Sequence, residues 1–222
     1  MQIHIPLIVG FTAALVHVLT GPDHLAAVTP LVLERHTKGW KIGAGWGLGH
    51  VTGMLLIGLL FYFFKEQIPV EYISQSSERF VGLMLMGIGF WALYRIQRTR
   101  RLTYPHTHEH EGEPYTHIHA HNGRHAHRHK RPGKALTAFF IGIVHGFAGI
   151  SHFILMLPVL GYRSRWDSVQ YMLGFAAGIV AAMVLYALVI ERFRRVKGLR
   201  TLQYLGAFFA LGIGIYWIST NG

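Results

Sequence analysis

The stretch His17-Val-Leu-Thr-Gly-Pro-Asp-His24 lies inside a long apolar run near the N-terminus and decides how the chain folds. Asp23 is the only side chain with a formal charge in residues 1–33, and a histidine stands on either side of it along the chain. An acid inside a segment long enough to span a bilayer is costly and is usually retained for function. Gly21 and Pro22 interrupt a helix. The stretch therefore predicts a broken transmembrane helix that carries an ion site.

A second stretch, His145-Gly-Phe-Ala-Gly-Ile-Ser-His152, repeats this spacing in the C-terminal half. Both stretches begin and end with histidine and have a glycine four residues after the first histidine, which is Gly149 in the second copy. Ser151 stands where the first copy has the aspartate. The shared spacing predicts an internal duplication with a second helix break at Gly149.

The composition is that of a membrane protein. Of the 222 residues, 51% are hydrophobic and only 14% are charged, with a mean hydropathy of +0.33. A transmembrane helix needs about 20 mostly apolar residues. The absence of cysteine excludes disulfides and thiolate metal ligands. Six apolar runs predict six transmembrane helices, at 5–33, 42–64, 80–96, 136–160, 169–190 and 199–219.

The duplication organises these helices into two halves. Gly87-Ile-Gly89 in the third run has a parallel in Gly212-Ile-Gly214 of the sixth, so the repeat extends over three helices in each half. An odd number of spans turns the second copy upside down relative to the first, which predicts inverted repeats related by an axis in the membrane plane. The expected fold is all-α, with one repeat over 1–97, a loop over 98–134 and the second repeat over 135–222.

Positive charge is distributed unevenly between the loops. The net charge is +11, but with alternating loops all lysines and arginines except four fall on one side of the membrane. The positive-inside rule places that side in the cytosol, with both chain ends outside and the 98–134 loop inside. We expect a cytoplasmic-membrane location and no nucleic-acid partner. The first run lacks the basic start of a signal peptide and is expected to stay as a span. The four exceptions are Lys65, Arg79, Arg163 and Arg165.

The 98–134 loop is rich in histidine. It holds nine of the 16 histidines, mixed with glutamate and arginine. Histidine-rich tracts are typical of metal binding, and this composition cannot form a packed core, so we expect disorder. A plain basic linker is the alternative. The nine are His106, His108, His110, His117, His119, His121, His125, His127 and His129.

The main ion site is expected between the two broken helices. On an unbroken helix His17 and His24 would lie roughly 10 Å apart along the axis, too far to share an ion. Unwinding at Gly21 would bring them together, and the inverted second copy would meet them near the bilayer centre. A further histidine, His50, lies deep in the second run, where a ligand and a structural role both stay open. The candidate ligands are His17, Asp23, His24, His50, His145, Ser151 and His152.

The motif His-x5-Asp-His, followed by Leu-Ala-Ala-Val and by Gly-Trp-Gly-Leu-Gly-His, resembles the nickel/cobalt transporter superfamily. The chain is most similar to its short, UreH-like branch of urease accessory membrane proteins. The resemblance implies that His17, Asp23 and His24 recognise the metal. The best-known permeases of that superfamily have four residues between the first histidine and the aspartate, where this chain has five, and eight spans instead of six.

Together these features predict a secondary transporter of a divalent transition metal, and no enzyme. Ni²⁺ or Co²⁺ is the expected substrate, Zn²⁺ stays open, and no organic cofactor is expected. Expected partners are the bilayer, the ion and a metallochaperone or metalloenzyme maturation protein, and oligomerisation stays open. The alternatives are an accessory protein that donates metal to an enzyme, a membrane enzyme with a histidine-bound di-metal cluster, and a carrier of a small anion.

Overall fold

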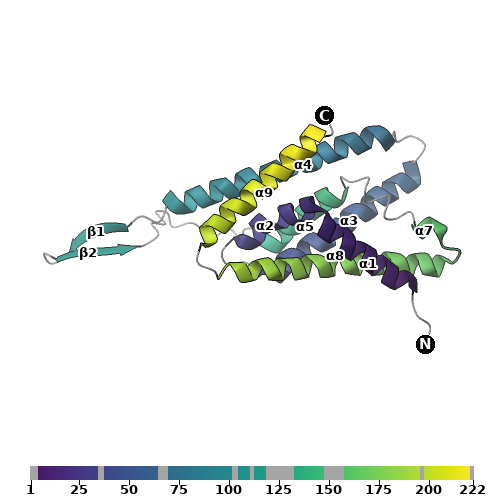
Figure 1. Cartoon of the computed structure of the whole chain (residues 1–222), viewed down its shortest axis with the longest axis horizontal. Coiled ribbons are helices and arrows are strands. Elements are labelled where there is room, and N and C mark those ends of the chain that lie inside the picture. Colours follow the sequence, from purple (N-terminus) through teal and green to yellow (C-terminus); the bar gives the residue numbers. More distant parts are fainter. Residues whose placement is uncertain are drawn as a thin grey trace.

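The chain forms a bundle of helices from which one hairpin projects (Figure 1). The computed structural model describes residues 5–34, 38–64, 70–101, 105–110, 113–118, 133–147, 158–195 and 198–220. Its elements are α1 (Ile5–Thr20), α2 (Pro22–Leu33), α3 (Gly39–Phe64), α4 (Val70–Arg101), β1 (Pro105–His110), β2 (Glu113–Ile118), α5 (Lys134–Phe147), α7 (Pro158–Gly161), α8 (Arg165–Phe193) and α9 (Leu199–Thr220).

Most of the predicted spans are present as helices. Within the described ranges, α3, α4, α8 and α9 are long and apolar enough to cross a bilayer, and α1 and α2 pass the same test as a pair bent by 72°. The predicted fourth span appears only as the 14-residue α5 and the short α7, because residues 148–157 lie outside the described part. Large apolar side chains cover the outside of the bundle, including Leu55, Phe63, Leu173, Leu185 and Phe208. Such a surface suits contact with lipid.

The helix α4 differs from the prediction in length. The apolar run predicted 80–96, whereas α4 has 32 residues and extends beyond that run at both ends. The predicted loop over 65–78 is therefore partly helical, and the predicted repeat boundary after residue 97 lies inside a helix. Once a helix is started, each added residue gains one hydrogen bond, so polar residues continue it beyond the apolar part.

Part of the histidine-rich loop is paired rather than disordered. β1 and β2 form an antiparallel hairpin in which His106 lies opposite His117. This differs from the disorder expected for these residues, because antiparallel pairing satisfies backbone hydrogen bonds without needing a hydrophobic core. Residues 111–112 and 119–132 lie outside the described part, so the expectation for them stays a prediction.

Glycines line the contact between α3 and α5. A Cβ atom added at Gly49 would overlap the backbone carbonyl of Phe139 and would lie 3.0 Å from the Ile143 nitrogen. A Cβ atom at Gly142 would likewise overlap the Trp46 carbonyl. Small residues allow helix backbones to approach closely where no side chain intervenes. The two helices therefore pack backbone to backbone.

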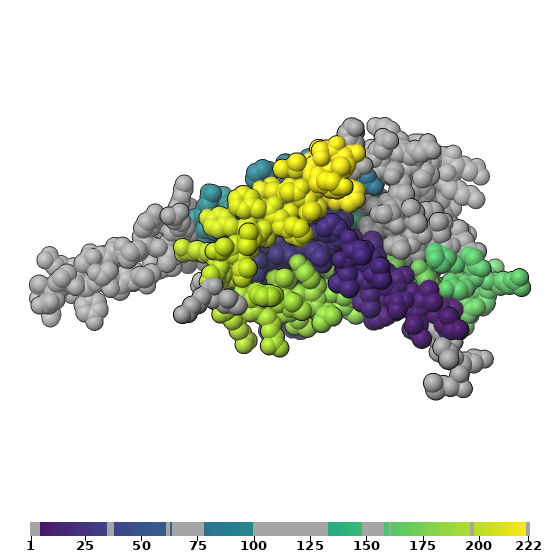
Figure 2. Space-filling view, in the orientation of Figure 1, coloured from purple at the N-terminus to yellow at the C-terminus, as the bar shows by residue number. Residues whose placement is uncertain are grey.

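The contact between α1 and α8 is built in the same way. A Cβ atom at Gly174 would overlap the carbonyl of Leu7, and one at Gly178 would lie 2.6 Å from the carbonyl of Phe11. In the space-filling view, the residues of α1 and α2 fill the space between α8 and α9 (Figure 2). The bent first segment is thus held by helices of the C-terminal half.

Charged side chains join α2, α4, α5 and α8 at one end of the bundle. Glu34 pairs with Arg95 in the C-terminal part of α4 and with Lys134 at the start of α5, where the Lys134 Nζ–Glu34 Oε2 distance is 3.1 Å. Arg194, just after α8, donates to the Glu34 backbone carbonyl at 3.1 Å and pairs with Glu191. Arg95, Lys134 and Arg194, which the positive-inside rule assigns to the same side of the membrane, therefore lie at one end of the bundle. The first turn of α1 and the last turn of α9 lie toward the opposite end (Figure 1).

The glycine contact between α3 and α5 gives a stability prediction. A Gly49→Ala variant should be destabilised by about 1–3 kcal/mol, because the added methyl group meets backbone that cannot move away. The matched control is Gly58→Ala in the same helix, where an added Cβ meets nothing within 4 Å. Alanine is the better helix former, so the control should unfold at the same or a higher temperature. Thermal loss of helical circular dichroism in detergent measures both, and equal midpoints would contradict the packing described.

Candidate metal centre

The break between α1 and α2 positions the first two candidate ligands. The Gly21 N–H donates to the His17 carbonyl at 3.0 Å, which closes α1, and the His24 N–H donates to the Gly21 carbonyl at 3.2 Å, which opens α2. Pro22 stands at the start of α2, where its missing N–H is not needed. The sharp bend places His17 and His24 side by side, with ring centroids 4.6 Å apart. The predicted helix break is therefore confirmed.

Asp23 lies in the first turn of α2 and bridges two histidines. The His24 Nδ1 is 2.9 Å from Asp23 Oδ1, and the His145 Nε2 is 3.1 Å from Asp23 Oδ2. The carboxylate is 13% exposed, whereas His24 and His145 are fully enclosed. A negative side chain is favoured in the first turn of a helix by the helix dipole. Since His145 comes from α5, the bridge joins the two halves of the chain.

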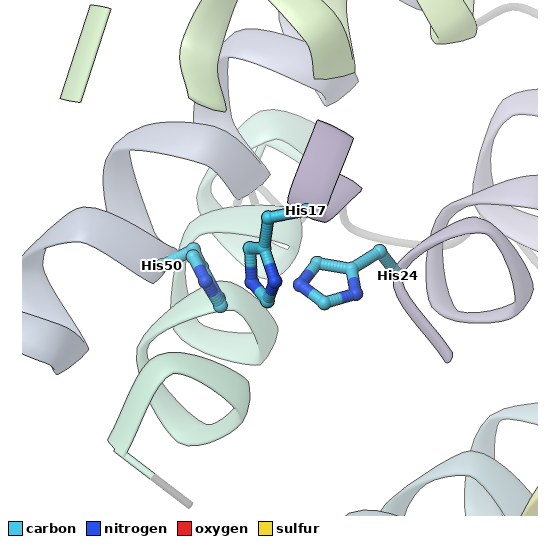
Figure 3. A group of neighbouring side chains, drawn as sticks. All are labelled: His17, His24 and His50. Atoms are coloured by element: carbon cyan, nitrogen blue, oxygen red, sulfur yellow. The ribbon is translucent and has the colours of Figure 1, made fainter. Parts of the chain in front are cut away.

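His50 of α3 is the fourth histidine of this group. Its ring centroid lies 5.2 Å from that of His24 and 5.5 Å from that of His145, and its side chain is fully buried. Figure 3 shows the rings of His17, His24 and His50 converging on one another from three ribbon segments. Four histidines and one carboxylate thus share a small volume inside an apolar bundle.

Two aromatic side chains wall this volume. Trp46, one turn before His50 in α3, stacks on the His50 ring at 4.8 Å and lies 5.3 Å from His145. Phe175 of α8 stacks on His17 at 6.3 Å. Both are fully buried, so they belong to the packed interior that surrounds the histidines. The Trp46 indole N–H has no hydrogen-bond partner among the described residues.

The donor atoms fall into two overlapping groups of three. His17, His24 and His50 form one group, and Asp23, His24 and His145 form the other. Within each group one donor atom from every residue lies within 4.8 Å of the others. Neutral imidazole suits Ni²⁺, Co²⁺, Zn²⁺ and Cu²⁺, and metal–nitrogen bonds are about 2.0–2.1 Å long. To bind one ion, the donor atoms of either group would have to come within about 4.2 Å of one another.

Five of the seven predicted ligands of the main site are therefore adjacent in space. The other two, Ser151 and His152, lie outside the described residues together with the predicted second break at Gly149. Among the loop histidines the structure describes only the backbone of His106, His108, His110 and His117, and the remaining five, His119, His121, His125, His127 and His129, lie outside the described residues. Metal binding by the loop stays a prediction.

Trp46 and Phe175 were not among the predicted site residues. One signal for Trp46 is present in the sequence, because it stands four residues before His50 and therefore on the same helix face. Phe175 has no such local signal, since it approaches His17 only through the packing of α8 on α1.

The chain is similar to three curated proteins. It is 30% identical to the urease accessory protein UreH of Bacillus sp. (strain TB-90) over 187 residues, which cover 83% of this chain and 75% of the relative. It is 31% and 29% identical to the chloroplast proteins FOR GROWTH AND FERTILITY 2 and 1 of Arabidopsis thaliana over 215 residues. The chain spans only about half the length of these two plant proteins, 54% and 56%. No protein-family model and no solved structure matches it.

The glycine at the break gives a prediction for the centre. Gly21 has φ −87°, a backbone that any residue adopts, so the glycine provides space and not conformational freedom. A Cβ atom there would overlap the His24 Nδ1 and lie 2.8 Å from its Cε1. A Gly21→Ala variant should therefore displace His24 and weaken Co²⁺ binding by at least about tenfold.

The same Co²⁺ titration on a Gly212→Ala variant is the control, because an added Cβ at Gly212 meets nothing within 4 Å. Both proteins should keep their helical circular dichroism. Unchanged Co²⁺ affinity in the Gly21→Ala variant would show that His24 does not need its present position.

Proposed function

This chain belongs to the family of the urease accessory protein UreH, and we propose that it carries a divalent transition-metal ion across the cytoplasmic membrane. Ni²⁺ and Co²⁺ are the first candidates for that ion. The observation that carries the proposal is the buried Asp23 carboxylate held between His24 and His145. A charged acid deep among apolar helices marks an ion pathway. The ion is the substrate, and the chain acts as a carrier rather than an enzyme.

The packing supports an inverted-repeat architecture. In the sequence repeat, α1 is equivalent to α5, so that Leu7 corresponds to Ala135. Likewise α3 is equivalent to α8, so that Gly45 corresponds to Gly174. The structure contains both contacts that this exchange requires, because Gly45 packs on the Ala135 carbonyl and Gly174 packs on the Leu7 carbonyl. The further contacts Gly49–Phe139 and Gly178–Phe11 are related in the same way.

Exchanging the two repeats also exchanges α4 with α9, so the contact between these two helices should look the same after the exchange. Gly82 packs on Gly214, and Gly89 packs on Ala207, so the two helices run antiparallel. Aligning Gly89 with Gly214 also aligns Gly82 with Ala207, which converts one contact into the other. We infer six spans in two inverted three-helix repeats with a pseudo-two-fold axis through the bundle.

The transport mechanism that follows is alternating access. The metal centre lies where ligands from α1, α2 and α3 meet α5 of the second repeat, so rocking of one repeat against the other would open the centre to either side. The Glu34–Lys134 pair joins the end of α2 in the first repeat to the start of α5 at one end of the bundle, and it would have to separate for that end to open. No nucleotide-binding motif is present in the sequence, so an ion gradient or a partner would supply the energy.

A second function, metal donation to an enzyme, is favoured by two observations. The relative that shows the family is named a urease accessory protein, and the chain also carries nine histidines in its 98–134 loop. A protein that hands metal to a maturation partner would depend on that loop, whereas a carrier would depend on the buried centre. Replacing the loop histidines separates these two functions.

The central test measures metal binding and uptake by full-length protein in which the nine loop histidines are replaced by asparagine. This protein should still bind Ni²⁺ or Co²⁺ and take it up into proteoliposomes. An added Asp23→Asn substitution should lower the affinity by roughly 100-fold, because it removes the charged ligand and leaves its two histidine partners without a carboxylate.

Asp167→Asn is the matched control, since Asp167 also lies in the first turn of a helix but outside the centre. It should bind and transport like its parent. A parent protein that neither binds nor transports metal would overturn the carrier function, and transport lost with the loop histidines alone would favour metal donation.

The orientation can be tested by cysteine labelling, because the chain has no cysteine of its own. Gly133 and Gly161 are exposed, and an added side chain meets nothing within 4 Å at either position. A Gly161→Cys variant should react with an impermeant maleimide on intact cells. A Gly133→Cys variant should react only after permeabilisation, since Gly133 adjoins Lys134 at the end assigned to the cytosol. The reverse pattern would invert the proposed orientation.

A further inference from the structure

We propose that the centre holds its ion in two adjacent positions that share His24, and that the ion passes from one to the other during transport. The first, the carboxylate position, is formed by Asp23, His24 and His145. The second, the imidazole position, is formed by His17, His24 and His50. The inference rests on the proposed carrier function, because it specifies where the transported ion resides.

His24 is the geometric middle of the cluster. Its ring centroid lies 4.6 Å from that of His17, 5.2 Å from that of His50 and 4.8 Å from that of His145. The His24 Nδ1 faces Asp23 at 2.9 Å. Figure 3 shows a ring nitrogen on the other side of the His24 ring directed toward His17. One imidazole therefore presents a nitrogen to each position.

One ion cannot use all five ligands at once. Donor atoms bound to a single metal ion at about 2.1 Å lie at most about 4.2 Å apart. Among the described residues, sets of donor atoms that all lie within 4.8 Å of one another contain three residues each. There are two such sets, and no set contains all five ligands. The cluster is built as two neighbouring half-sites.

Charge decides how the two positions are used. The carboxylate position offsets part of the ion's charge, whereas the imidazole position offers only neutral ligands. In a low-dielectric interior the carboxylate therefore makes its position the lower in energy. Two divalent ions at once would place four positive charges beside one carboxylate, so we expect a single ion. It rests in the carboxylate position and visits the imidazole position on its way through the protein.

The test counts imidazole ligands of bound Co²⁺ by X-ray absorption spectroscopy in the full-length protein with asparagine at the nine loop positions. A His145→Asn substitution removes a ligand of the carboxylate position and should move the ion to the imidazole position. The imidazole count should then rise, from two toward three, although a histidine has been removed. A single site that used all the histidines would instead show a fall, and a fall would overturn the two-position arrangement.

A His50→Asn variant tests the arrangement independently and serves as the matched histidine substitution. Because His50 belongs only to the imidazole position, Co²⁺ affinity should stay within about twofold, while the uptake rate should fall at least about tenfold. In the His145→Asn protein, the same His50→Asn substitution should abolish binding, a non-additivity that signals two alternative positions. A tenfold loss of affinity from His50→Asn alone, or an unchanged uptake rate, would overturn the inference.

The two levels of the proposal fail differently. If the parent protein binds no Co²⁺, the carrier function is overturned and the two positions with it. If the parent binds and transports Co²⁺ but the imidazole count falls in the His145→Asn protein, the carrier function stands and only the two positions are overturned.

Discussion

The bridge from His24 through the Asp23 carboxylate to His145 is the interaction on which the rest of the structure depends. A carboxylate among apolar helices is tolerated only when polar groups surround it. Here those groups come from the two halves of the chain, since His24 follows the helix break and His145 lies on the buried face of α5. The bend at Gly21, the approach of α5 and the burial of both rings together bring the two histidines to the Asp23 carboxylate.

Close helix approach is the second constraint. His50 reaches the centre because α3 and α5 touch through backbone at Gly49 and Gly142, where any larger side chain would hold the helices apart. The contacts of α1 with α8 repeat this arrangement. Helices that meet through glycine have no side chains to interdigitate, so their relative position follows from backbone shape. The backbone contact between α3 and α5 therefore also fixes where His50 and His145 lie relative to each other.

Much of the architecture could be predicted because bilayer thickness and hydropathy act over whole segments. The apolar runs located the helices, and Gly21 with Pro22 located the break. The length of α4 and the pairing of β1 with β2 were missed, because helix propagation and strand pairing continue where hydropathy has no signal. The walls of the site were also missed, since Phe175 reaches His17 only through packing.

By itself, the sequence determined the number and placement of the apolar segments, the break in the first of them and the set of residues able to bind a metal. These are local properties, because hydropathy, proline and glycine act within a few residues of their position. Only the tertiary structure decided which nitrogen of His24 faces Asp23, that His50 joins His17 rather than Asp23, and that the ligands divide into two groups. Those relations join atoms on different helices, so they exist only after the helices have packed.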